Sequence, residues 1–101
     1  MSKNMNEEVR TKLIKSLTNE LPVLRAKLNI SQEDLAEKIG VSRQTINAIE
    51  AKKRDMSWGM FLSMVFFFDF NEKTSTMLNM LGIVKSDLDE QLTVQSEEEK
   101  E

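Results

Sequence analysis

The sequence predicts an all-α fold, because apolar residues recur at helical spacing along most of its 101 residues. Only three glycines and one proline interrupt the chain, and alternating β-branched residues are rare. Hydrophobic residues make up 40% of the sequence, which suffices for one core. These features indicate a single helical domain with polar ends.

The composition argues against several classes of protein. Histidine and cysteine are absent, so disulfides, thiolate metal sites and the commonest general base are excluded. We therefore expect neither an enzyme nor a bound cofactor or metal. The N-terminus lacks the apolar segment of a signal peptide, and the most apolar run, Met60–Phe68, is shorter than the ~20 residues of a membrane span. The chain is expected in the cytoplasm, away from membranes.

The first helical segment is predicted to start at Asn6, whose side chain can cap a helix with two acids in its first turn. Pro22 interrupts the apolar stripe, and proline cannot donate to the carbonyl four residues back. We therefore predict two helices, 6–18 and 19–28. The stripe consists of Val9, Leu13, Ile14, Leu17, Leu21, Leu24 and Leu28.

Two short helices are predicted to meet at a tight turn in the middle of the chain. Ser31 is placed to cap helix 32–39, with Asp34 three residues later as in a capping box. Gly40 follows the last apolar position, where a left-handed residue is favoured. Ser42 caps the second helix, which extends to residue 51. A helix, a tight turn and a second helix form the geometry of a major-groove reader.

The outer face of helix 42–51 carries side chains suited to base edges. Arg43 can bind guanine, Gln44 and Asn47 can bind adenine, and the methyl group of Ala48 can touch thymine. The alternative is an ordinary solvated face. The preceding helix, the glycine turn and the serine cap favour the interpretation as a DNA-binding surface.

Basic charge gathers on this motif although the chain has a net charge of −3. The segment 38–54 holds five basic residues against one acid, and the segment 85–101 holds seven acids against two lysines. Lys52, Lys53 and Arg54 are predicted phosphate contacts. They also suit the negative end of the preceding helix dipole, and the two roles are compatible.

Ser57 is predicted to cap a helix over 58–68 that is apolar on most sides. Such a helix is either the centre of the monomer core or packs partly against a second copy. A short helix over 74–81 ends at Gly82. Residues 83–101 are predicted to be an acidic, partly disordered tail, with one or two helical turns between 83 and 92.

The stretch LRAKLNISQEDLAEKIGVSRQTINAIEAKKR resembles the lambda-repressor-like helix-turn-helix proteins, the Cro/C1-type or Xre family. The resemblance implies a five-helix DNA-binding domain over 19–82, with its motif at 31–51. Residues 1–18 would then be an extra N-terminal helix and 83–101 a C-terminal extension. Lys52 departs from the family, which often has glycine there. Either Lys52 adopts a left-handed conformation, or the helix continues for another residue.

The resemblance also implies roles for individual residues. A structural salt bridge is expected between Arg25 and Glu50. The implied phosphate contacts are Gln32 and Thr45, and the implied base contacts are Arg43, Gln44, Asn47 and Ala48.

The function expected from the resemblance is sequence-specific binding of double-stranded DNA by a transcriptional regulator, a repressor that acts as a homodimer. The alternative is an antitoxin-like or adaptor module that binds another regulatory protein, with DNA binding secondary. The Met/Phe-rich helix and the acidic tail would then be the interaction surfaces.

Overall fold

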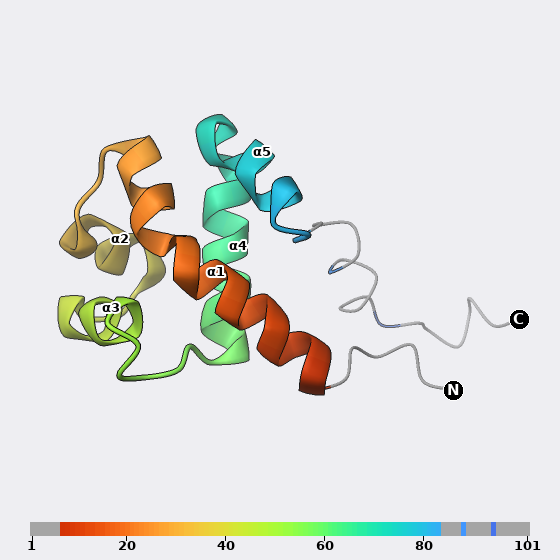
Figure 1. The fold of residues 1–101 in the computed structure, drawn as a ribbon. Helices are drawn as coiled ribbons and strands as arrows, with labels where there is room; N and C mark the ends of the chain where they lie inside the picture. Colours follow the sequence, from red (N-terminus) through yellow and green to blue (C-terminus); the bar gives the residue numbers. More distant parts are fainter. Residues whose placement is uncertain (1–6, 84–87, 89–93, 95–101) are drawn as a thin grey trace, which may run out of the picture.

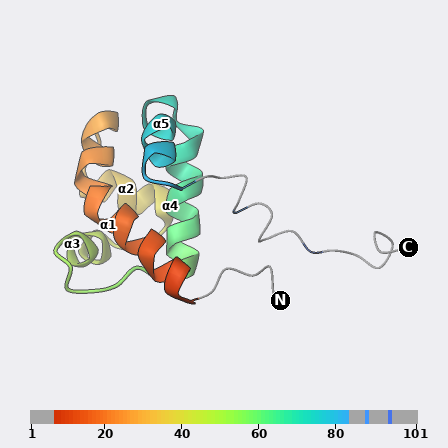
Figure 2. The same ribbon diagram turned by 45° about the vertical axis from the view of Figure 1, so that its right-hand side comes forward.

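The computed structural model describes residues 7–83, Leu88 and Val94. Within these residues the chain forms five α-helices and no strand, which confirms the all-helical prediction. Helix α1 runs diagonally across the domain and packs against α3, α4 and α5 (Figure 1). Seen from the side, α3 lies at the edge of the domain (Figure 2). The helices are α1 (Glu7–Leu28), α2 (Gln32–Ile39), α3 (Arg43–Glu50), α4 (Trp58–Phe70) and α5 (Glu72–Met80).

Helix α1 is continuous over 22 residues, so the predicted break before Pro22 is wrong. Proline inside a helix costs ~3 kcal/mol relative to alanine. Leu17, Leu21 and Leu24 lie on one side of the helix and are all 0% exposed, and burying each contributes ~1.5–3 kcal/mol. Packing thus outweighs the proline, whose side chain is exposed. The predicted extra N-terminal helix is instead the first half of α1.

The predicted helix starts at the motif are confirmed. The Ser31 hydroxyl accepts a hydrogen bond from the Asp34 amide at 3.0 Å, and the Asp34 carboxylate accepts one from the Ser31 amide at 3.0 Å. Ser42 caps α3 through the Thr45 amide at 3.1 Å. Gly40 has a φ of 90°, which glycine adopts without strain. The capped ends and the glycine turn fix the angle between α2 and α3.

Helix α3 ends at Glu50, and Lys52 adopts the left-handed conformation with a φ of 63°. The Lys53 amide donates to the Ala48 carbonyl and the Lys52 amide to the Ile49 carbonyl, both at 2.9 Å. These bonds form the Schellman arrangement, in which glycine is preferred. The alternative of a longer helix is therefore wrong, and a left-handed lysine costs ~1 kcal/mol.

Replacing Lys52 with glycine is expected to raise the free energy of unfolding by about 0.5–1 kcal/mol, because it relieves this backbone strain. The side chain is exposed, so its loss removes no core contact. Urea denaturation would measure the change. The matched control is Lys52→Gln, which removes the charge but keeps the strain, and it should not raise stability. Equal stability of the two variants would contradict the assignment of strain.

Helix α4 forms the centre of the core, as one of the two predicted alternatives proposed. Phe61, Met64 and Phe68 are 0% exposed. Its C-terminal part also presents Phe66 and Phe70 to solvent, at 65% and 83% exposure. The helix ends at Phe70, two residues later than the predicted end at residue 68.

Helix α5 starts directly after Asn71, where the buried hydroxyl of Thr74 donates to the Phe68 carbonyl at 2.6 Å. This bond ties the start of α5 to the end of α4. The helix ends before Gly82, which has a φ of 80°. Ile83 and Leu88 are buried and add to the core. The predicted helical turns over 83–92 and the predicted disordered tail otherwise lie outside the described residues.

The core connects all five helices. Across the described part of the chain, no helix has the length and apolarity needed to cross a membrane. The buried apolar residues are Leu17, Leu21, Leu24, Leu35, Ala36, Ile46, Ile49, Met56, Phe61, Met64, Val65, Phe68, Leu78, Ile83 and Leu88.

Candidate nucleic-acid interface

Helix α3 packs one side against the core and exposes the opposite side to solvent. Ile46 and Ile49 are 0% exposed and anchor the helix to the core. The side chains of Arg43, Gln44 and Asn47 are exposed, and Ala48 is partly buried. The four predicted base contacts therefore lie on the side of α3 that faces away from the core. Asn47 also forms a hydrogen bond with α2, which is described below.

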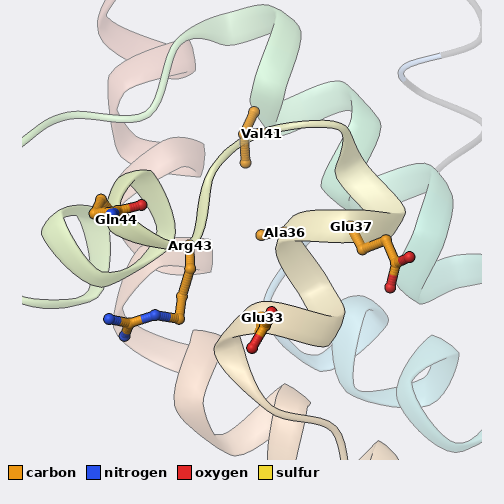
Figure 3. A pocket seen from close by; sticks show the side chains of 6 residues that line it. All are labelled: Glu33, Ala36, Glu37, Val41, Arg43 and Gln44. Carbon is orange, nitrogen blue, oxygen red and sulfur yellow. The ribbon is translucent and has the colours of Figure 1, made fainter.

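Arg43 and Gln44 line an open pocket of about 540 Å³ between α2 and the start of α3. Figure 3 shows that the two side chains leave the first turn of α3 in different directions. The pocket is also lined by Glu33, Ala36 and Glu37 of α2 and by Val41 of the turn between the helices (Figure 3). Arg43 is exposed and makes no ion pair within 4.0 Å among the described residues, so its guanidinium is accessible from solvent.

A hydrogen-bonded ion pair holds α3 against α1. The Arg25 guanidinium donates to both carboxylate oxygens of Glu50, from Nε at 2.7 Å and from Nη2 at 2.9 Å. A third Arg25 nitrogen donates to the Ile30 carbonyl at 3.2 Å. The side chains are only 18% and 8% exposed. The salt bridge implied by the family resemblance is confirmed, with the bidentate geometry that makes Arg–carboxylate pairs strong.

The network changes the proton affinity of both groups. Burial alone would raise the pKa of Glu50, but hydrogen bonds from Arg25 and Gln32 and the Arg25 charge outweigh it and lower the pKa. The hydrogen bond to Glu50 likewise raises the pKa of Arg25, against the opposing effect of burial. Both side chains therefore stay charged at neutral pH.

Gln32 extends this network to the outer face of α3. Its amide donates to Glu50 at 3.0 Å, and its carbonyl oxygen accepts from the Asn47 amide at 3.3 Å. The predicted phosphate contact Gln32 thus lies at the start of α2 but is engaged inside the domain. One N–H of Gln32 and one N–H plus the carbonyl oxygen of Asn47 stay available for a nucleic acid.

The remaining predicted phosphate contacts lie at both ends of α3. The Thr45 hydroxyl is 3.0 Å from the Ser42 hydroxyl and accepts from Arg54 at 3.5 Å. Lys52 and Arg54 are exposed and line a second pocket together with α1. Lys53 is exposed, and its backbone amide is already bonded to Ala48. The structure therefore brings Thr45 and Arg54 together and keeps Lys53 apart on the surface.

Two features of this surface were missed by sequence reasoning. The bridging position of Gln32 depends on contacts with residues 15 and 18 positions away, and no local pattern encodes them. The approach of α1 to Lys52 and Arg54 was missed because a break in α1 was predicted. Among the described residues, no group of three or more acids is arranged to hold a metal ion.

Comparison with known proteins identifies the family. The helix-turn-helix family model matches residues 24–57, which include α2, the turn and α3. An uncharacterized HTH-type transcriptional regulator from Methanocaldococcus jannaschii is 50% identical over 52 residues, 52% of this chain and 79% of that protein. No solved structure gives a significant match. The five-helix fold, the capped motif and this relative together show that the chain belongs to the Cro/C1-type family of helix-turn-helix transcriptional regulators.

Proposed function

We propose that this protein is a sequence-specific transcriptional repressor that places α3 in the major groove of double-stranded DNA. One observation carries the proposal: Arg43, Gln44 and Asn47 are exposed on the first two turns of a helix whose other side is locked to α1 and α2. Such groups can form bidentate hydrogen bonds with guanine and adenine. A fixed helix makes those bonds selective, because a wrong base leaves them unpaired.

The other exposed polar residues would position the helix without selecting a sequence. Thr45 and Arg54 share a hydrogen bond at one edge of α3, and Lys52 and Lys53 follow its end. Hydroxyl, lysine and arginine groups at such edges suit the two strands of phosphates beside the groove. Gln32 would add one amide N–H at the start of α2, where the helix dipole favours an anion.

The length of α3 supports a homodimer. Eight residues span ~12 Å of helix, the rise of roughly four base pairs, so one copy reads a short site. Two copies related by a two-fold axis would read half-sites ~34–36 Å apart. A dimer bound at a promoter would repress transcription by occupying it. As a DNA-binding regulator, the protein would act in the cytoplasm.

Selection from a random duplex library with the purified chain tests the proposal directly. Enrichment of a short two-fold symmetric motif is the expected result, together with a solution mass of two copies on the selected site. Failure to enrich any motif at moderate salt would refute sequence-specific binding.

Two substitutions separate base reading from phosphate contact. Arg43→Ala is expected to cost ~1–3 kcal/mol on the preferred site and to relax selectivity at one base pair. Lys53→Ala should weaken binding to all sequences about equally and reduce the salt slope of log K by ~1. Titrations at several salt concentrations, on the preferred and a scrambled site, would measure both effects. If Arg43→Ala weakened both sites equally, the groove assignment would be wrong.

A second candidate function is an antitoxin-like or adaptor role, in which the protein binds another regulatory protein. The exposed rings of Phe66 and Phe70 favour it, because they lie beside a pocket of about 330 Å³ that includes Ile39 and Phe67. Substituting both exposed rings with serine separates the functions. Under the adaptor model a co-purifying protein is lost and DNA selection is unaffected.

A further inference from the structure

The first half of α1 lies outside the matched family region, yet it borders the basic turn after α3. Ile14, Lys15, Thr18 and Asn19 of α1 line one pocket of about 290 Å³ with Lys52, Arg54 and Asp55. Two segments more than thirty residues apart thus form one surface, which we call the α1 basic pocket. Figure 1 shows α1 crossing above the loop that leaves α3.

The charges of the α1 basic pocket are not neutralised within the domain. Lys15, Lys52 and Arg54 bring three positive charges, against the single carboxylate of Asp55. Between residues 7 and 83 the sole ion pair closer than 4.0 Å joins Arg25 and Glu50. Lys15 and Lys52 are exposed. Three cations that line one pocket and form no ion pair among the described residues favour binding of an anion from solution.

The pocket is continuous with the proposed DNA-binding surface. Arg54 lines it and also donates to the Thr45 hydroxyl at 3.5 Å, and Thr45 is in the first turn of α3. The left-handed conformation of Lys52 turns the chain after α3 back toward α1. The amide of Asn19 is exposed at the same pocket and can donate a hydrogen bond to an oxygen.

We propose that the α1 basic pocket binds a backbone phosphate that flanks the half-site, with Lys15 as its main contact from α1. The pocket thereby lengthens the DNA footprint beyond the helix-turn-helix motif. This inference rests on the proposed DNA binding. Asp55 opposes the phosphate, so the contact is expected to be weaker than the cations alone would make it.

The test uses the full chain and a duplex carrying its selected site. A neutral methylphosphonate replaces one phosphate at a time through the flanking positions. We expect wild-type protein to lose about 3- to 10-fold in affinity at one flanking phosphate. In Lys15→Gln, replacing the same phosphate should no longer change the affinity. The slope of log K against log salt concentration should fall in magnitude by ~0.9.

Two further variants serve as matched controls. Lys73→Gln removes another exposed lysine, on α5 and outside the pocket. It should leave the salt slope and the effect of the flanking phosphate as in wild type. Asp55→Asn removes the opposing carboxylate and should tighten binding a few-fold at low salt. An unchanged phosphate pattern and slope in Lys15→Gln, or weaker binding by Asp55→Asn, would overturn the inference.

Failure of this inference is distinguishable from failure of the proposed function. If Arg43→Ala changes base preference while Lys15→Gln behaves like Lys73→Gln, α3 reads the DNA sequence but the α1 basic pocket does not bind a backbone phosphate. If no DNA site is selected at all, the proposed function and this inference are both refuted.

Discussion

Replacing Glu50 with alanine is expected to lower the free energy of unfolding by about 3 kcal/mol, among the largest losses that one polar substitution can cause here. Glu50 accepts hydrogen bonds from Arg25 and from Gln32. Its removal leaves the guanidinium of Arg25, whose side chain is only 18% exposed, without its counter-charge. Urea denaturation at pH 7 would measure the loss. Glu37→Ala is the control, because Glu37 is exposed on α2 and should change stability by under ~0.5 kcal/mol.

The same residue predicts a pH dependence. The pKa of Glu50 in the folded protein lies below its usual 4.5, so the unfolded chain takes up a proton first as pH falls. The stabilisation is therefore complete above pH 4.5 and is lost as pH falls through the folded pKa. The stability advantage of wild type over Glu50→Gln should be largest at neutral pH and shrink as the pH falls below 4.5. An advantage that did not change with pH would argue against the ionised pair.

Replacing Pro22 with alanine is expected to raise the free energy of unfolding by about 1–3 kcal/mol. Alanine restores the amide donor to the Thr18 carbonyl and removes the clash of the proline ring with the preceding turn. Because Pro22 is exposed, the substitution opens no cavity. A gain of that size raises the melting temperature by ~4–8 °C per kcal/mol in a domain of this length.

A matched control for this change is Thr11→Ala, at another exposed position of α1. Thr11→Ala should add only the few tenths of a kcal/mol that separate threonine from alanine in helix propensity. Calorimetry of the three proteins measures the difference. If Pro22→Ala raised the free energy of unfolding no more than Thr11→Ala does, Pro22 would not destabilise α1.

The local parts of the fold were predictable because short-range chemistry determines them. The serine caps at 31, 42 and 57 and the left-handed Gly40 depend on residues within four positions, and the structure has them as predicted. The break in α1 was wrong because tertiary burial of Leu17, Leu21 and Leu24 overrides the local effect of proline. The ends of α4 and α5 were misplaced because Thr74 bonds across the junction.

The candidate site likewise has parts that could be predicted from the sequence and parts that could not. The exposed face of α3 followed from helical periodicity, and the Arg25–Glu50 pair followed from the family resemblance. The link through Gln32 to Asn47 and the approach of Lys15 to Arg54 needed the packing of separate helices. The roles assigned to base and phosphate contacts stay predictions until DNA binding is measured.

The hydrogen bond between Asn47 and Gln32 bears on how this regulator could acquire a new operator. Arg43 and Gln44 make no hydrogen bond to other side chains in the described part of the chain, so their replacement would change base preference without disturbing the framework. Asn47 shares its amide with α2, and its replacement would also alter the support of α3. A change in base preference, in nature or by design, would therefore arise most easily from substitutions at positions 43 and 44.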